Sequence, residues 1–417
     1  MTILQKQFIH KLASVHKIGE VTGQMWRLRN ILDRNRYNLT VLTFPVDFVS
    51  KKIKRRTNKA VYNISMRGIN IIHTFDSTIL YARLNSHYSY WAYDEKNIYP
   101  IWYQSDTMLQ LLPLMYRYIN PQNYCSLTDL EVQMGNKLRD KFGIPENAQI
   151  VTFHIREPGY TSSKESYSFR NADIRNYIPA IHYLIEKGFY IVRLGDKRMK
   201  KLVNTPTQLI DAPFHPDYTD LVDPYFVYSS KFYFGSDSGP LGLAMMFGIP
   251  ALRTDTPILA LNDGPNENEL IIFKKLFSRK LKRFLTYEEA ILSPCSTFFH
   301  DKYYDKAEID VIDNSPEEIL MAVKEIDDRL DGNFPASEIE KINRRVRDIH
   351  EKGLYIHKIK RPKKEYLRKA AHFTYQPYYS WFLSKTQLSV EFTKLNPFFL
   401  GHEWSTLYNE NLNEESS

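Results

Sequence analysis

From residue 149 onward, the chain alternates between short apolar runs and longer amphipathic segments. The apolar runs lie at 149–155, 189–193, 231–234 and 251–253. Segments with helical spacing lie between them, at 174–187, 217–229 and 239–247. Strands that alternate with helices form parallel sheets, because the crossover helix brings the chain back to the end of the sheet where the previous strand began. We therefore predict an α/β domain with a parallel sheet and helices on both faces.

The first part of the chain, to about residue 145, has a more mixed pattern. We predict strands at 37–44 and 68–75, and a glycine-containing turn that opens a helix at 17–30. Two further segments have helical spacing, 106–119 and 126–141, and Ser126 is a candidate cap for the second. Near the other end, helices are expected at 315–329, 336–352 and 389–395.

The run from Phe232 to Pro250 carries the most informative pattern. An aromatic apolar stretch ends in a turn rich in glycine and serine, and small and apolar residues at helical spacing follow it. A strand that turns tightly into a helix points free backbone N–H groups and the positive end of the helix dipole at one spot. The turn lacks the Gly-Lys-Ser/Thr of a Walker loop. We therefore predict a different kind of phosphate site, made by Gly235, Ser236, Asp237, Ser238 and Gly239.

Polar side chains follow the strand that begins at Gln149. His154 and Arg156 share a face because side chains alternate along a strand, and Glu157 is the first loop residue. Ligand sites lie at the carboxyl ends of parallel strands, where Arg156 could hold a diphosphate bidentately. Glu157 is the first candidate for a general base, and His154 is a further catalytic candidate. The alternative for this cluster is an Arg–Glu ion pair that closes the strand end.

A loop at 170–173 follows this strand and contains Arg170, Asn171 and Asp173. Arg170 and Asn171 are candidates for binding the ligand phosphates, although Arg170 could also be a surface residue. Asp173 is the second candidate for the general base, and a helix cap explains it equally well.

The next strand end contributes three more candidate residues. Arg193 is a second cation for the phosphates, and Gly195 permits close backbone approach. Asp196 either binds a hydroxyl or caps the following turn. Asn262 lies in an Asn-Asp-Gly-Pro turn and could reach the same ligand, although turn chemistry alone accounts for it.

Composition narrows the partners. The 417 residues are 43% apolar, which suits two or three domains with sizeable cores. The net charge of +8 favours anionic partners, and basic residues cluster at 51–59 and 274–283. Such runs are usually solvated faces, and contact with an anionic membrane is the alternative. The runs lack regularly interleaved aromatic residues, so nucleic acid is not expected as a partner.

Two cysteines, Cys125 and Cys295, make neither a disulfide framework nor a zinc site, which fits a reducing, cytoplasmic compartment. No continuous apolar run reaches the roughly 18 residues of a membrane span, and no cleavable signal is evident. Paired metal-ligand motifs are absent, so we expect no metal and no cofactor. Cationic side chains and a helix N-terminus would then stabilise a leaving diphosphate.

Taken in order, the motifs resemble a known family. They are His-Ile-Arg-Glu-x-x-Tyr at 154–160, Arg-Asn-Ala-Asp-Ile-x-x-Tyr at 170–177, Val-Arg-x-Gly-Asp at 192–196, Phe-Gly-x-x-Ser-Gly…Phe-Gly-Ile-Pro at 234–250, and Leu-Ser-x-x-Phe at 388–392. This series resembles a family of bacterial glycosyltransferases of GT-B architecture, distantly similar to the fucosyltransferase group. That family often has Asp where Glu157 stands here, and Glu keeps the carboxylate with a longer reach.

The resemblance implies two Rossmann-like domains that face each other across a cleft, with a C-terminal helical tail that packs back. We expect an acceptor-side domain over 1–145, a donor domain over 146–370, an aromatic-rich tail over 371–409 that crosses back, and disorder over 410–417. The implied reaction moves a sugar from a nucleotide-sugar donor to a glycan or glycolipid, in lipopolysaccharide or capsule synthesis. Direct displacement with inversion is the default mechanism.

Two other functions are open at this point. An epimerase or hydrolase of the same architecture would consume a nucleotide sugar without an acceptor. A peripheral membrane or glycan-binding protein would need no catalytic residues at all.

Overall fold

The computed structural model describes the central and C-terminal parts of the chain most fully. It covers residues 6–12, 18–31, 37–47, 57–73, 88–93, 98–102, 125–158, 167–258, 269–298, 300–356 and 386–401. Several sequence predictions lie outside these residues: Asn262, the helix at 106–119, the basic residues 51–56, the first part of the tail at 371–385, and the disorder over 410–417. None of the helices in the described part is long and apolar enough to cross a membrane.

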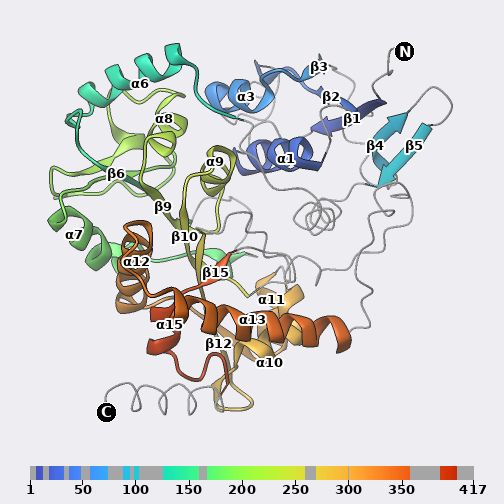
Figure 1. Cartoon of the computed structure of the whole chain (residues 1–417), viewed down its shortest axis with the longest axis vertical. Helices are drawn as coiled ribbons and strands as arrows, with labels where there is room; N and C mark the ends of the chain where they lie inside the picture. Colours follow the sequence, from blue (N-terminus) through green and yellow to red (C-terminus); the bar gives the residue numbers. More distant parts are fainter. Residues whose placement is uncertain are drawn as a thin grey trace.

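A seven-stranded sheet organises the second part of the chain, and all of its pairings are parallel. Its order is β15-β11-β10-β9-β6-β7-β8 (Figure 1). The strands are β6 (Ile150–His154), β7 (Tyr190–Arg193), β8 (Leu209–Asp211), β9 (Phe232–Ser236), β10 (Ala251–Thr256), β11 (Leu270–Phe273) and β15 (Gln387–Leu388). The predicted parallel sheet is confirmed.

This order has a functional meaning. Counting the strands from β6 along the chain, the six from β8 to β11 lie in the order 3-2-1-4-5-6 of dinucleotide-binding folds. The chain starts in the middle at β6, builds outward through β7 and β8, and then returns to place β9 on the other side of β6. The carboxyl ends of β6 and β9 are therefore the topological switch point, where such folds bind ligands.

Helices cover both faces of the sheet because strand side chains alternate. Val151 and Phe153 join the apolar cluster under α7 (Ile178–Glu186) and α12 (Pro316–Leu330). Ile150 and Tyr233 point to the other face, under α8 (Val222–Tyr228) and α9 (Leu241–Phe247). The helix predicted at 174–187 begins as a 3-10 turn, η2 (Ile174–Tyr177), and the one predicted at 217–229 is shorter than expected.

The first part of the chain forms a five-stranded sheet of order β3-β2-β1-β4-β5. β1 (Lys6–Leu12), β2 (Tyr37–Thr43) and β3 (Asn70–His73) are parallel, whereas β4 (Tyr88–Tyr93) and β5 (Ile98–Trp102) pair antiparallel. The predicted strands at 37–44 and 68–75 are confirmed. This sheet is thus Rossmann-like on one side of β1 only, because an antiparallel pair completes the other side.

The predicted helix at 126–141 exists as α6 (Asp129–Lys141), but Thr128 caps it rather than Ser126. Thr128 and Glu131 form a reciprocal capping box, which satisfies two N-terminal groups at once. The predicted boundary at residue 145 assigns α6 to the first domain, yet α6 packs on α8 of the second. The Tyr225 hydroxyl donates to Asn136 Oδ1 at 2.8 Å.

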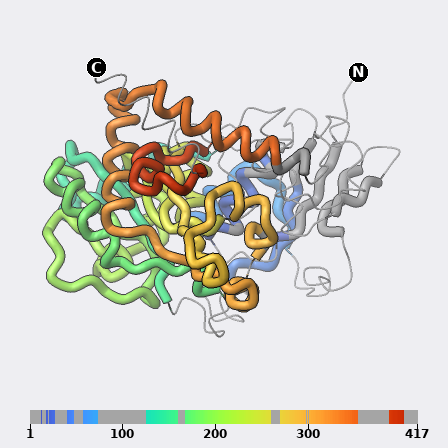
Figure 2. Tube along the Cα trace, turned by 90° about the horizontal axis from the view of Figure 1, so that it is seen from below, coloured from blue at the N-terminus to red at the C-terminus, as the bar shows by residue number. Residues whose placement is uncertain are grey.

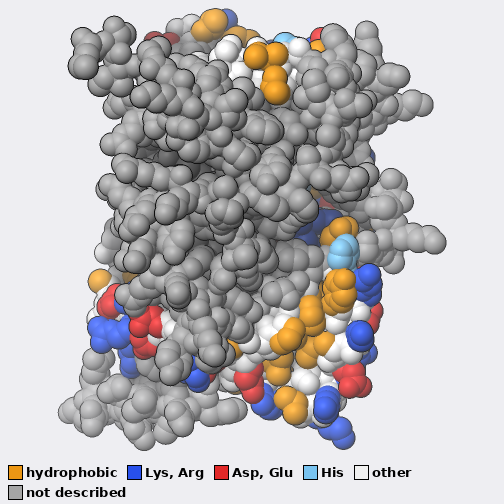
Figure 3. All heavy atoms as spheres, turned by 90° about the vertical axis from the view of Figure 1, so that its right-hand side faces the viewer, with side chains coloured by type: hydrophobic (Ala, Val, Ile, Leu, Met, Phe, Trp, Pro, Cys, Tyr) orange, Lys and Arg blue, Asp and Glu red, His pale blue; other side chains and the backbone are white. Residues whose placement is uncertain are grey.

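The basic run at 274–283 forms β12 (Lys275–Ser278) and β13 (Arg283–Phe284), which make a three-stranded sheet with β14 (Ile309–Ile312). Four of its basic residues form ion pairs. Lys274 and Lys275 are mostly buried and pair with Asp313 and Glu318, whereas the pairs Arg279–Asp310 and Arg283–Glu289 are exposed. On the face shown in Figure 3, Lys and Arg are interspersed with Asp and Glu. Contact of this run with a membrane stays a prediction.

The described tail returns to the second sheet instead of crossing to the first. It follows α13 (Ala336–Ile356), adds β15 beside β11 and ends in α15 (Val390–Leu395), which lies against α13 and α12 (Figure 2). The buried Glu325 carboxylate accepts from Ser389 Oγ and from the backbone N–H groups of Val390 and Glu391. The helix predicted at 389–395 is confirmed, with Ser389 as its cap.

The two parts of the chain are joined where α1 (Ile18–Ile31) lies on α9 (Figure 1). A Cβ at Gly19 would lie 2.9 Å from Gly239 Cα, and one at Gly242 would lie 2.2 Å from Thr22 Oγ1. Trp26 of α1 and two residues of α3 (Lys59–Met66) join the same apolar cluster as α8 and α9. Small residues thus let the helices approach closely. The cleft expected between the two sheets stays a prediction.

We predict that Gly242→Ala destabilises the protein by about 1–3 kcal/mol, because the new methyl group overlaps the Thr22 hydroxyl. Urea unfolding of Gly242→Ala, Thr22→Ala and the double variant measures the coupling. The double variant should be more stable than the sum of the single effects, because Thr22→Ala removes the clashing atom. Independent, additive effects would contradict the close approach.

Candidate functional site

The carboxyl ends of β6 and β9 meet more closely than two ordinary residues allow. Gly235 has φ +145°, and a Cβ there would lie 1.9 Å from the carbonyl oxygen of His154. His154 and Gly235 are register partners in the parallel pairing. Glycine is required at this position by the strand contact itself, whether or not a phosphate binds beside it.

Two serines tie the loop after β9 to the loop after β6. Ser236 is fully buried, and its Oγ accepts from the backbone N–H of Arg156 at 2.8 Å. Ser238 Oγ lies 2.7 Å from His154 Nδ1 and is partly exposed. Of the two hydroxyls predicted at the phosphates, Ser238 is therefore the one placed to reach a ligand. Gly239 packs on Gly19 of α1.

His154 is a neutral imidazole at physiological pH. Burial, and next the positive charge of Arg193, lower the pKa of His154 to about 4. With one ring nitrogen beside Ser238, the ring is held in one orientation at the switch point. A pKa this low makes His154 a weak base at neutral pH, so its catalytic role stays a prediction.

Arg193 is placed differently from the prediction. Its side chain is 0% exposed, and it donates to Glu157 Oε2 at 2.6 Å, Asp211 Oδ1 at 3.1 Å and the Lys200 carbonyl at 2.9 Å. We correct its role from a phosphate-binding cation to a buried cation that joins the ends of β6, β7 and β8. The Arg–Glu ion pair weighed for this cluster therefore exists, with Arg193 as the cation.

The same ion pair bears on Glu157 as a general base. The carboxylate is mostly buried and is held by Arg193. Burial raises the pKa of Glu157, and Arg193 opposes the effect. Glu157 thus has the raised pKa of a candidate base, but its nearest partner is a structural cation.

Asp173 and Asp196 both take the capping roles considered as alternatives. Asp173 Oδ1 accepts from the Arg175 N–H at the start of η2, and Arg175 pairs with its carboxylate. Hydrogen bonds from Arg175 hold the pKa of Asp173 below its usual value. Asp196 Oδ1 accepts from the Arg198 N–H. Burial raises the pKa of Asp196, but Arg198 has the larger total effect, so the pKa lies below its usual value.

Two neighbouring predictions are explained by packing. Gly195 has φ +137°, and a Cβ there would lie 2.0 Å from Met199 Sδ and 3.2 Å from His154 Cδ2. Asn171 is anchored through its backbone, since the buried Lys274 donates to its carbonyl. The loop that carries Arg170 is therefore fastened to the body of the sheet.

Arg170 and Arg253 flank Asp237 in the loop after β9. Arg170 Nη2 donates to the Asp237 carbonyl at 2.9 Å and lies 4.0 Å from Oδ2. Arg253 Nη2 lies 3.6 Å from Oδ1. The sequence analysis missed Arg253, because a single arginine in a short apolar strand gave no motif. Its register opposite Gly235 in the β9–β10 pairing brings it to this edge.

A second missed group is a buried polar network at the end of β10. Asp255 is fully buried with φ +47°, and it accepts from the Tyr177 hydroxyl at 2.7 Å and the Asn314 N–H at 2.7 Å. Burial raises the pKa of Asp255 to about 6. These hydrogen bonds are buried, so the network stabilises the carboxyl end of β10 and does not face a ligand.

Glu269 is a third buried charged residue, after Arg253 and Asp255, that was not predicted from the sequence. It accepts from Thr386 Oγ1 at 2.7 Å, and burial raises the pKa of Glu269 to about 7, although Arg253 lowers it. The positive charge of Arg253 therefore favours the ionised form of Glu269, against the effect of burial. Among the residues that the structure describes, no group of three or more His, Cys, Asp or Glu could hold a metal ion.

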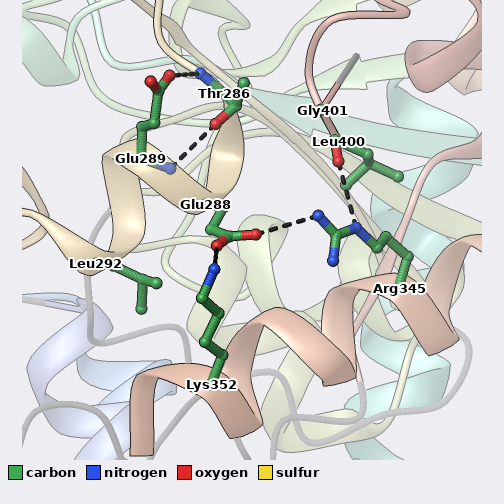
Figure 4. A pocket seen from close by; sticks show the side chains of 8 residues that line it. All are labelled: Thr286, Glu288, Glu289, Leu292, Arg345, Lys352, Leu400 and Gly401. Atoms are coloured by element: carbon green, nitrogen blue, oxygen red, sulfur yellow. Dashed lines mark hydrogen bonds and ion pairs between the residues drawn. The ribbon is translucent and has the colours of Figure 1, made fainter. Parts of the chain in front are cut away.

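A separate hollow of about 380 Å³ lies between α10 (Tyr287–Leu292), α13 and the end of the tail. Glu288 pairs there with Arg345 at 3.1 Å and with Lys352 (Figure 4). None of its lining residues belongs to the switch-point site. The ion pairs of Glu288 join α10 to α13, and Arg345 Nε donates to the Leu400 carbonyl at 3.3 Å, which ties the end of the tail to α13.

We predict that Arg193→Met lowers the free energy of unfolding by about 3–5 kcal/mol, because it leaves two buried carboxylates without their cation. The matched control is Arg198→Met, which removes an exposed guanidinium from Asp196 and should cost about 1 kcal/mol or less. Urea midpoints measure both. Equal effects would show that Arg193 is not structural.

The pKa of Glu269 makes a second prediction. Since its folded pKa lies above that of the unfolded chain, its stabilising contribution is complete below about pH 4.5 and is lost as the pH rises toward 7. Glu269→Gln should therefore gain stability relative to the wild type between pH 5 and pH 8, by on the order of 2 kcal/mol. Melting curves at both pH values, with the exposed Glu340→Gln as control, measure this. A difference that does not change with pH would count against a buried, protonated Glu269.

Comparison with known proteins finds no matching family model and no matching curated protein. Solved structures with a partial likeness include a glycosyl transferase family 9 protein from Veillonella parvula (10% identity, TM-score 0.43, 78% of this chain and 98% of that one). ADP-heptose lps heptosyltransferase II of E. coli (13%, 0.38, 76% and 98%) and E. coli heptosyltransferase WaaC with ADP (11%, 0.31, 72% and 99%) are others. At this level of similarity they do not assign a family, and the likeness to the fucosyltransferase group stays a prediction.

Proposed function

We propose that this chain is a glycosyltransferase that moves a sugar from a nucleotide-sugar donor to a hydroxyl of a glycan or glycolipid in bacterial surface polysaccharide synthesis. The observation that carries the proposal is the switch point of the parallel sheet. There, His154 and Ser238 meet at the carboxyl ends of β6 and β9, Arg170 lies in a neighbouring loop, and Arg253 lies in β10. This arrangement suits a diphosphate whose charge grows as the sugar leaves.

The donor phosphates would lie against Ser238 and Arg170. Arg170 comes from a loop anchored by Lys274, and Arg253 adds a buried positive charge behind the site. Arg156 remains a candidate for the same ligand, because its backbone is bonded to Ser236 at the switch point. Fixed cations stabilise a leaving nucleoside diphosphate without needing to reorganise during the reaction. We therefore keep the proposal of a metal-independent, inverting displacement.

The structure bears on the choice of base. Arg175 holds Asp173 and lowers its pKa, whereas burial raises the pKa of Glu157 beside Arg193. His154 has a pKa of about 4 and is therefore a weak base. We keep Glu157 as the candidate base and propose that neutral His154 orients Ser238 at the strand ends.

The location and membrane contact are also proposals. Cys125 and Cys295 are free and buried, which fits work in the reducing cytoplasm. A glycolipid acceptor would bring the enzyme to the inner face of the membrane. Of the first basic run, Lys59 pairs with Asp47 at 2.9 Å, so this residue would contribute little to such contact.

We predict that one of the nucleotides UDP, GDP, ADP, dTDP and CMP raises the melting temperature by several degrees when it is present at 100 times its Kd. Because it binds only the folded chain, it adds about 2.7 kcal/mol to the free energy of unfolding. Arg170→Ala should remove most of this shift. Arg175→Ala, which removes an exposed arginine from the neighbouring η2, should leave it intact. If none of the nucleotides shifts the wild type, the donor site is wrong.

Incubation with the sugar nucleotide that binds separates this function from its rivals. A glycosyltransferase releases nucleoside diphosphate only when an acceptor is present, and it forms a glycosidic product. Release without an acceptor would indicate a hydrolase, and an isomerised donor would indicate an epimerase.

A further inference from the structure

Asp237 occupies an unusual position for a residue of a phosphate-binding loop. It lies in the turn after β9, and its carboxylate is the group between the guanidinium groups of Arg170 and Arg253. The Asp237 and Arg170 side chains are about one-third exposed, at 33% and 34%, whereas Arg253 is 3% exposed. A negative charge therefore already stands where the two cations converge.

The geometry of these contacts is that of a loose pair. The carboxylate oxygens lie 4.0 Å from Arg170 Nη2 and 3.6 Å from Arg253 Nη2, beyond the 2.7–2.9 Å typical of charge-assisted hydrogen bonds. Arg193, by contrast, holds Glu157 at 2.6 Å. A phosphate that makes short hydrogen bonds to the guanidinium groups would therefore compete well with the Asp237 carboxylate.

The loop does not depend on this carboxylate for its shape. Arg170 donates to the Asp237 carbonyl at 2.9 Å, and the flanking Ser236 and Ser238 are bonded to the β6 side. The side chain of Asp237 can thus rotate away while its backbone stays anchored.

We propose that Asp237 is a placeholder anion, whose carboxylate occupies the position between Arg170 and Arg253 that a phosphate group of the ligand takes. This inference rests on the proposed function, because it names how the donor site behaves when it is empty. The carboxylate keeps the two arginines in place and lowers the affinity of the site for weaker anions. A diphosphate, with several charged oxygens, displaces it, whereas an uncharged sugar does not.

The test is Asp237→Asn, which keeps the size of the side chain and removes its charge. Titration calorimetry with pyrophosphate, and with the nucleoside diphosphate that stabilises the wild type, should show Kd lowered by about tenfold for both ligands. Asp348→Asn is the charge-matched control, since Asp348 is exposed on α13, and it should change Kd little. Asp237→Ser serves as a second variant if the first does not fold.

The sign of the effect decides the matter. If Asp237 instead accepts hydrogen bonds from ribose or sugar hydroxyls, Asp237→Asn weakens binding of the nucleoside diphosphate, and the placeholder role is overturned. Unchanged affinity for both ligands overturns it too. Tighter binding of pyrophosphate in a chain that binds no nucleotide would support the placeholder and contradict the proposed donor. If the wild type and Asp237→Asn bind the nucleotide with the same Kd, the proposed donor site is supported and the placeholder role is contradicted.

Discussion

The close approach of β6 and β9 is the constraint on which the rest of the site depends. Gly235 leaves no room for a side chain beside the His154 carbonyl, so the two strand ends lie against each other at the switch point. That contact brings Ser238 to His154 and Ser236 to the loop of Arg156. A bulkier residue at Gly235 would separate the two loops that form the candidate site.

Charge burial is the second organising feature of this edge. Arg193, Arg253 and Lys274 are all buried, and each faces carboxylates of its own surroundings. A buried cation is tolerated only when partners compensate it, so these side chains hold strand ends and loops in defined positions. The partly exposed members of the site, Arg170 and Ser238, rest on this framework. The arrangement separates the residues that support the edge from those that can meet a ligand.

The first part of the chain contributes through contact with α9. Gly19, Gly239 and Gly242 let α1 and α9 approach closely, and an apolar cluster continues from Trp26 into the second sheet. The glycine-rich turn therefore has two functions. Gly235 lets β9 contact the end of β6 at the switch point, and Gly239 and Gly242 let α1 pack against α9.

Hydrophobic patterning placed β6, β7, β9 and β10 and the helices between them, because burial on two faces leaves a regular pattern, whereas the short strands β8, β11 and β15 were not predicted. The strand-end motifs likewise brought His154, Ser238 and Arg170 to one edge. The ion pairs could not be predicted from the sequence. Arg193 and Glu157, for example, are far apart along the chain, and the order of the strands brings their charges together. The same holds for Arg253 and Asp237, and for the basic residues at 274–283. Local sequence sets which elements form, whereas the partner of each charge is decided by long-range packing, which the order of residues along the chain does not display.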